Sequence, residues 1–188
     1  MPEPRHSGDL ADGAVRDRLA AAVRAVDAPD VVFAYSRAGR RALCSGGTAP
    51  PRPRPREQLR YETGSASKTY GALLLARLHT AGLVGLGDPA LPLLAPECEA
   101  PGAAPVTLFH LATHTSGLPR LPADLYPRAV GALLTNPYAG YPAARLVDRF
   151  RREALRRPAR PRPGTRWRYS NFGAAILGHA LAAAHPGR

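Results

Sequence analysis

The sequence predicts an α+β protein, because one amphipathic helix and one β-hairpin precede a series of further helices. Residues 9–26 carry apolar side chains at helical spacing, which is typical of a helix with one buried face. Residues 31–35 are mostly β-branched or aromatic and favour a strand, and residues 42–45 favour a second, weaker strand. Gly39 lies in the segment between them, residues 36–40, which we expect to be a turn.

Four helices of different lengths are expected after the hairpin. Their predicted bounds are residues 65–81, 108–113, 143–157 and 172–184. Leu74, Leu78 and Ala81 form the apolar face of the first of these helices. Asp9 and Thr107 each precede a predicted helix and carry a side-chain oxygen that can accept a hydrogen bond from its first turn. We therefore expect both residues to act as N-caps.

The length of 188 residues suits one domain or a part of a larger one. We expect residues 1–8 to form a disordered tail and residues 9–188 to belong to one domain. The N-terminus lacks the apolar segment of a secretory signal, and no run approaches the roughly 18 apolar residues of a membrane helix. These observations predict a cytoplasmic protein with no transmembrane segment.

Arginine dominates the charge of the chain, whose formal net charge is +12. The Arg-rich segments at residues 51–56 and 149–168 are interrupted by proline, which predicts loops or extended linkers. Neither segment contains a recognisable nucleic-acid-binding motif. We therefore predict a solvated Arg-rich surface with no specific nucleic-acid partner, and a basic nucleic-acid-binding protein stays as an alternative function.

The cysteine and histidine residues do not match a metal-binding pattern. Cys44 and Cys98 are far apart and not in a C-x-x-C spacing, which favours two small buried hydrophobic side chains over a bridge or a metal site. His110 and His114 are four positions apart, but no third ligand is evident beside them. We expect both histidines to be packed or hydrogen-bonded.

Ser65 and Lys68 are the first candidates for catalytic residues. They are three positions apart where a loop turns into a helix, so their side chains lie on the same helical face. A serine hydroxyl is a poor nucleophile until a neighbouring base takes its proton. Lysine can be that base when burial lowers its pKa, whereas arginine stays protonated, and Lys68 is the only lysine in the chain. The structural alternative is that Ser65 caps the helix and Lys68 lies on the surface.

Tyr169 and Asn171 are the second pair of candidates. A tyrosine can shuttle protons when a nearby cation lowers its pKa, and an asparagine two residues later can orient a substrate amide or the lysine. The structural alternative is a rim aromatic and a helix cap. Residues 107–119 are expected to form a capped helix and a glycine turn that support the site.

Together these segments resemble the serine β-lactamase and penicillin-binding-protein superfamily, and most nearly its branch of class C β-lactamases, DD-peptidases and esterases. The resemblance rests on the sequences Y-E-T-G-S-A-S-K-T-Y at residues 61–70, T-L-F-H-L-A-T-H-T-S-G-L-P at 107–119 and P-G-T-R-W-R-Y-S-N-F-G at 163–173. A further segment with Asp88 and Pro89 follows the first motif, as in the family. Each motif alone is weak, but their order and spacing together are specific.

The resemblance implies a role for each of four residues. Ser65 would be the acylated nucleophile and Lys68 its activating base. Tyr169 would take part in proton transfer to the leaving group and in deacylation, and Asn171 would position the substrate and Lys68. The implied activity is that of a serine hydrolase or acyltransferase acting on a β-lactam, a D-Ala-D-Ala peptide or an ester, with no metal and no organic cofactor.

The family has a third motif, which is Lys or His, then Thr or Ser, then Gly, on a C-terminal strand that supplies the second oxyanion donor. No such triad follows Asn171. We therefore expect the N-terminal part of a β-lactamase/transpeptidase-like fold, an antiparallel sheet flanked by helices plus a helical lobe, without the C-terminal strands. We expect weak or no activity of the isolated chain and a complementing C-terminal polypeptide as a partner. A non-catalytic remnant or binding partner of the same fold is the alternative function.

Overall fold

A computed structural model describes residues 3–51, 53–98, 105–125, 138–155 and 162–185. The chain divides into two compact units, Met1–Glu62 and Thr63–Arg188, and each is considered separately below. Residues 156–161 of the second Arg-rich segment, and with them the last two residues of the helix expected at 143–157, lie outside the described residues.

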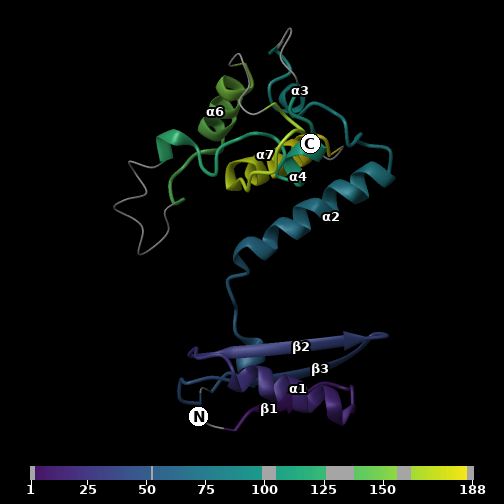
Figure 1. The fold of residues 1–188 in the computed structure, drawn as a ribbon, viewed down its shortest axis with the longest axis vertical. Coiled ribbons are helices and arrows are strands. Elements are labelled where there is room, and N and C mark those ends of the chain that lie inside the picture. The colour runs from purple at the N-terminus through teal and green to yellow at the C-terminus, as the bar shows by residue number, and fades with distance from the viewer. Residues whose placement is uncertain (1–2, 52, 99–104, 126–137, 156–161, 186–188) are drawn as a thin grey trace. The chain divides into compact units, whose positions relative to one another are not determined.

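The first unit is a three-stranded antiparallel sheet packed against one helix (Figure 1). Its elements are β1 (Arg5–Ser7), α1 (Gly13–Arg24), β2 (Val31–Arg37), β3 (Arg40–Gly46) and the 3₁₀ helix η1 (Arg56–Gln58). The strand order is β1-β3-β2, so β3 is central. The core of the unit lies between α1 and the sheet, where Val23, Ala42 and Cys44 are fully buried.

The β-hairpin forms as the sequence predicts, with longer strands. The two residues of its turn, Ala38 and Gly39, both have positive φ, at 48° and 79°. This is the backbone twist that two-residue hairpin loops favour, because it matches the right-handed twist of the strands. Arg37 pairs with Arg40 directly across the turn.

The N-terminal tail expected at residues 1–8 is replaced over residues 5–7 by strand β1. His6 is the register partner of Cys44, and Arg5 and Ser7 pair with the neighbouring positions of β3. A short polar segment such as this has no strand signal of its own, but the free edge of β3 offers it backbone hydrogen bonds. Pairing with β3 therefore makes these residues a strand.

Helix α1 begins later than expected, with Asp12 rather than Asp9 as its N-cap. The Asp12 carboxylate accepts a hydrogen bond from the Val15 N–H at 3.2 Å. The Asp9 carboxylate instead accepts from the Arg41 N–H at 2.6 Å, and this hydrogen bond lowers the pKa of Asp9. The assignment of Asp9 as the cap was wrong because the hairpin binds its side chain.

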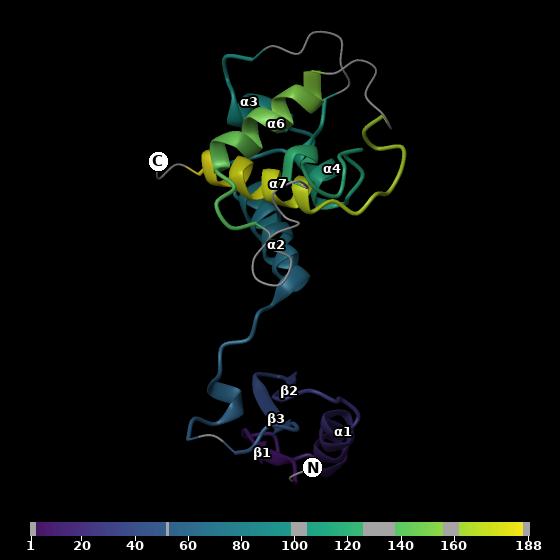
Figure 2. The same cartoon turned by 90° about the vertical axis from the view of Figure 1, so that its left-hand side faces the viewer.

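The second unit is helical, and helix α7 is at its centre (Figure 2). Its elements are the 3₁₀ helix η2 (Gly64–Ala66), α2 (Ser67–Thr80), α3 (Ala90–Leu94), α4 (Leu108–Ala112), the 3₁₀ helix η3 (Ala123–Leu125), α6 (Ala143–Leu155) and α7 (Asn171–Ala183). Helix α7 contacts α2, α3, α4 and α6. Phe172, Ile176 and Leu181 of α7 are almost completely buried in this core.

Two local predictions in this unit have different outcomes. Thr107 caps α4 as expected: its side chain accepts from the His110 N–H, and the His110 ring accepts in return from the Thr107 N–H. The apolar face predicted for α2 is wrong at Leu74, which is 42% exposed, whereas Leu75 is buried. Three consecutive leucines fit either face by spacing, and packing against the core selects Leu75.

Three of the four arginines of α6 pair with carboxylates on the same helix, whereas Arg145 pairs with Asp124 of η3. The ion pairs within α6 join Arg149 to Glu153, and both Arg151 and Arg152 to Asp148. The Arg-rich segment expected at residues 149–168 as a loop is therefore helical over its first seven positions. Pairs three or four positions apart are neighbours on a helix surface, which favours the helix over an extended linker.

The two cysteines are free thiols. Cys44 is buried, and burial raises the pKa of its thiol. Cys98 is half-buried in the second unit. Within the described part of the chain, no helix is long and apolar enough to cross a membrane.

We expect Thr107→Ala to lower the free energy of unfolding by about 1 kcal/mol, because the first turn of α4 loses its side-chain cap. Thr107→Ser keeps the hydroxyl and is the matched control. Urea denaturation followed by circular dichroism measures both variants. Equal stability of Thr107→Ala and Thr107→Ser would show that the cap does not contribute.

Candidate active site

The segment that carries Ser65 turns from a 3₁₀ helix into α2. Gly64 has φ of 52°, a left-handed value that costs little without a Cβ atom. Ser65 lies in η2, and Lys68 lies in the first turn of α2, which begins at Ser67 rather than at Ser65 as predicted. The Ser67 hydroxyl donates to the Gly64 carbonyl at 2.7 Å. Ser65 is therefore the serine whose hydroxyl is free to face Lys68.

The structure brings Ser65, Lys68 and Tyr169 together. The Lys68 ammonium donates to Ser65 Oγ at 3.2 Å, and the Tyr169 hydroxyl donates to the same atom at 2.7 Å. Lys68 Nζ also lies 5.2 Å from the centroid of the Tyr169 ring. Ser65 and Tyr169 are 104 positions apart in the chain, so this meeting is a property of the tertiary fold.

The pKa of the Tyr169 phenol is lowered in this environment. The largest cause is hydrogen bonding to Lys68, followed by hydrogen bonding to Ser65, and desolvation opposes both. The positive charges of Lys68 and Arg120 add to the effect, and the Arg120 guanidinium lies 5.7 Å from the ring centroid. Stabilisation of the anion increases the fraction of phenolate near neutral pH, and the phenolate is the form that can accept a proton.

Ser65 Oγ accepts both hydrogen bonds in this arrangement. Its own proton must turn toward Lys68 or Tyr169 before either group can take it. Activation of Ser65 therefore requires that one of these two neighbours first loses a proton. Lys68 is half-buried and Ser65 is exposed, so a substrate can reach the hydroxyl.

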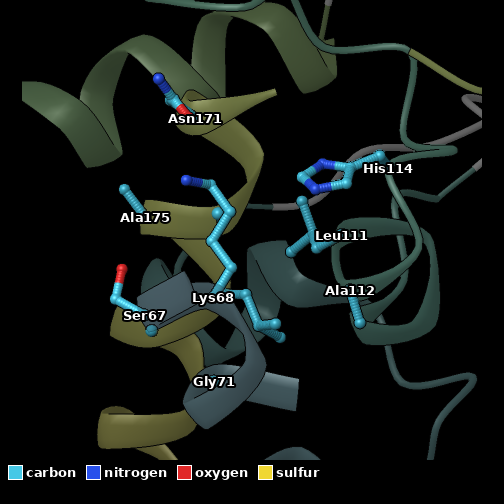
Figure 3. Close-up of a pocket in the computed structure, with 11 residues that line it drawn as sticks. Ser67, Lys68, Gly71, Leu111, Ala112, His114, Asn171 and Ala175 are labelled. Carbon is cyan, nitrogen blue, oxygen red and sulfur yellow. The ribbon is translucent and has the colours of Figure 1, made fainter. Parts of the chain in front are cut away.

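Asn171 lies close to this group without a hydrogen bond to Lys68. Its Nδ2 atom donates to the Tyr138 hydroxyl at 3.1 Å, and its Oδ1 atom is buried without a partner among the described residues. Ser170, rather than Asn171, caps α7 by accepting from the Gly173 N–H at 2.8 Å. Asn171 and Lys68 are both among the residues that line a cavity of about 330 Å³ (Figure 3).

The loop that carries Tyr169 is held against residues 114–120 by hydrogen bonds. The Gly164 N–H donates to the Thr115 carbonyl at 2.8 Å, and the Ser170 hydroxyl donates to the Pro119 carbonyl at 2.7 Å. Further bonds run from the N–H groups of Arg168, Asn171 and Phe172 to the carbonyls of His114 and Arg120. The C-terminal half of the predicted supporting stretch, residues 107–119, therefore holds this loop.

His114 is the contact to Tyr169 that the sequence analysis did not assign. Its ring centroid lies 4.6 Å from that of Tyr169, and its Nδ1 atom accepts from the Ser170 N–H at 3.2 Å. Burial, followed by the charge of Lys68, lowers the pKa of His114. Its φ of 58° is unusual for a residue with a side chain. In the sequence, His114 is marked only by its position shortly before the turn at Ser116 and Gly117. Its contact with Tyr169 is visible only in the fold.

The histidines do not form a metal centre in the described part of the chain. His110 acts in the capping box of α4, and its Nε2 atom lies 3.0 Å from where a Cβ on Gly164 would be. No group of three or more His, Cys, Asp or Glu side chains that could hold a metal ion occurs among the described residues.

A serine hydroxyl that bonds both a lysine and a tyrosine is typical of serine hydrolases. Comparison with known proteins identifies the family: the family model described as Beta-lactamase matches residues 15–188. The chain therefore belongs to the beta-lactamase family, within the superfamily of serine β-lactamases and penicillin-binding proteins.

The chain is also similar to two curated proteins, both described as D-alanyl-D-alanine-carboxypeptidase/endopeptidase AmpH. They come from Escherichia coli strain K12 and Escherichia coli O157:H7, and each is 30% identical to this chain over 131 residues. The matched region is 69% of this chain and 31% of each relative, so the similarity spans less than a third of the relatives' length. No solved structure matches the chain.

We expect Lys68→Met to raise the pKa of Tyr169 toward its ordinary value of 10.0, because the largest stabiliser of the phenolate is removed. Ultraviolet titration at the phenolate band measures this pKa as the difference between each protein and its Tyr169→Phe variant. Arg120→Gln is the comparison and should give a smaller rise, since Arg120 contributes least. An unchanged Tyr169 pKa in Lys68→Met would show that Lys68 is not the cause.

Proposed function

We propose that this chain is an acyl-transferring serine hydrolase in which Ser65 is the nucleophile and Lys68 and Tyr169 manage its proton. The observation that carries the proposal is that Ser65 Oγ lies within hydrogen-bond distance of both Lys68 Nζ, at 3.2 Å, and the Tyr169 hydroxyl, at 2.7 Å. Membership of the beta-lactamase family supports the same reaction class.

In the reactive state, the Lys68 and Tyr169 pair together lacks one proton, and we call this missing proton the vacancy. The vacancy exists either as neutral lysine beside phenol or as ammonium beside phenolate. Hydrogen bonding to Lys68 is the main cause that lowers the pKa of Tyr169, and it makes the phenolate easier to form. In acylation the Ser65 proton moves to this vacancy while Oγ bonds to the substrate carbonyl carbon. The proton then passes from Tyr169 to the leaving group as the carbonyl–leaving-group bond breaks, which restores the vacancy.

Deacylation uses the same groups in reverse. A water molecule loses a proton to the Lys68 and Tyr169 pair and attacks the acyl carbon, and the proton returns to Ser65 Oγ as the ester bond breaks. The backbone N–H of Ser65 lies in a 3₁₀ turn at the start of α2 and would donate to the oxyanion. The unpartnered Oδ1 of Asn171 would accept from a substrate amide or from Lys68.

The proposed substrate is a peptide that ends in D-alanyl-D-alanine. This choice rests on the curated relatives, which are described as D-alanyl-D-alanine carboxypeptidase and endopeptidase. Such a peptide carries the amide N–H and carbonyl groups that Asn171 and the Ser65 N–H would bind. A β-lactam ring presents the same type of carbonyl in a strained and reactive form, which makes a fluorescent penicillin a suitable probe.

Fluorescent penicillin should label the chain covalently at Ser65. We expect the label to be lost in Ser65→Ala and retained in Ser67→Ala, because Ser67 donates its hydroxyl to the Gly64 carbonyl. Gel fluorescence and peptide mass spectrometry measure the label and its position. A folded wild-type chain that takes no label would favour the non-catalytic alternative over this proposal.

Peptide turnover by a polypeptide limited to residues 1–188 should be slow. Residues 172–188 contain no Lys/His-Thr/Ser-Gly triad, and the resemblance implies that this triad supplies the second oxyanion donor. One missing donor costs roughly 10² to 10³ in rate. Release of D-alanine from a D-Ala-D-Ala peptide measures turnover, and addition of a polypeptide that carries such a triad should raise it. Turnover at about 10 s⁻¹ by the chain alone, the median for enzymes, would contradict this expectation.

A further inference from the structure

His114 contacts the residues on both sides of Tyr169. Its carbonyl accepts from the Arg168 N–H at 2.7 Å, and its ring Nδ1 accepts from the Ser170 N–H at 3.2 Å. One residue therefore holds the backbone immediately before and immediately after the tyrosine. Because these two bonds bracket Tyr169, they limit the directions in which its side chain can leave the backbone.

The ring of His114 also packs against the ring of Tyr169. The two centroids are 4.6 Å apart and the planes are tilted by 39°. The Trp167 ring meets His114 edge-on, with centroids 6.3 Å apart. The far end of Tyr169, its hydroxyl, lies 2.7 Å from Ser65 Oγ. Packing on one face of the tyrosine and hydrogen bonds on its backbone together direct the hydroxyl toward Ser65.

The hydrogen bond to Ser170 determines the protonation state of the imidazole. A backbone N–H can only donate, so Nδ1 of His114 must present a lone pair, and the ring proton of the neutral form is on Nε2. Protonation would place a second N–H opposite the Ser170 N–H. The Ser170 bond would then break, and the restraint on Tyr169 would be lost with it.

The groups around the ring do not favour a positive charge on it. Helix α2 presents Lys68, and the loop before α7 presents Tyr169, beside which lies the Arg120 guanidinium. Helix α4 and helix α7 present only uncharged residues to the shared cavity, and no carboxylate is among its described lining residues (Figure 3). The lowered pKa of His114 agrees with this environment.

We propose that His114 is a positioning residue whose neutral imidazole holds Tyr169 in reach of Ser65, and that its protonation releases Tyr169 and slows acylation. The inference rests on the proposed function for the catalytic role of Tyr169. The contact of His114 with Tyr169 and Ser170 is independent of that function. Because the folded state favours the neutral ring, the restraint is complete above the ordinary histidine pKa of 6.5 and is lost as the pH falls below the lowered value.

Two substitutions separate the hydrogen bond from the backbone conformation. His114→Asn keeps an acceptor near the position of Nδ1, tolerates the left-handed backbone and does not titrate. His114→Gly also tolerates that backbone but has no acceptor and no ring. His79→Asn changes an exposed histidine on α2 that bonds the Val84 carbonyl, and it is the control.

The first measurement needs no activity. Nuclear magnetic resonance titration of the full chain follows the His114 ring and the Ser170 amide between pH 4 and 8, a range that includes the ordinary histidine pKa of 6.5. We expect the Ser170 amide shift to follow the titration of His114 in the wild type and in His79→Asn. We expect no such transition at Ser170 in His114→Asn. A Ser170 amide that does not follow His114 would overturn the inference.

The second measurement is the rate of Ser65 labelling by fluorescent penicillin across the same pH range. At pH 8 we expect His114→Asn to label within about threefold of the wild type and His114→Gly to label at least about tenfold more slowly, in keeping with the sensitivity of catalysis to misplaced groups. The acid limb of the wild type should coincide with the titration of His114 and shift in His114→Asn. An identical pH profile in wild type and His114→Asn would overturn the inference.

The two measurements also separate this inference from the proposed function. A wild-type chain that takes no label at any pH, but whose Ser170 amide follows His114, would refute the hydrolase mechanism and confirm the contact. A chain that labels normally at Ser65 while Ser170 is independent of His114 would refute the positioning role and leave the hydrolase mechanism standing.

Discussion

The active-site geometry depends on the docking of the loop before α7 onto residues 114–120. N–H groups and one hydroxyl of that loop donate to a series of carbonyls in this segment, and the imidazole of His114 adds a further acceptor. Ser65 and Tyr169 are 104 positions apart, so their meeting requires that a large loop be closed. The entropy cost of that closure is offset by these bonds together with the burial of the helical core.

The same junction begins the central helix of the unit. Ser170 is almost completely buried, donates to the Pro119 carbonyl and accepts from the Gly173 N–H. A Cβ atom on Gly173 would lie 3.3 Å from Ser170 Oγ, so glycine permits the close approach. Phe172 enters the core directly afterwards. The position of Tyr169 is therefore coupled to the packing of α7, because only two residues separate Tyr169 from the buried Phe172 ring.

The features that the sequence predicted well are those that a few neighbouring residues determine. Ser65 and Lys68 share a helical face by their spacing, and Thr107 caps α4 through bonds that reach only three positions. The predictions that were wrong concern residues whose contacts are decided by a part of the chain distant in sequence. Asp9 was expected to cap α1, but its carboxylate binds the Arg41 N–H of the hairpin, and Leu74 gives way to Leu75 on the buried face.

The sequence by itself determined the hairpin, most of the helices, the pairing of Ser65 with Lys68 and the resemblance to a family of serine hydrolases, because these follow from local spacing and from the order of motifs. Only the tertiary structure decided that Tyr169 reaches the same serine oxygen, that Asn171 bonds Tyr138 and not Lys68, and that His114 brackets the tyrosine. These contacts join segments separated by tens of residues, and no local periodicity encodes such distances.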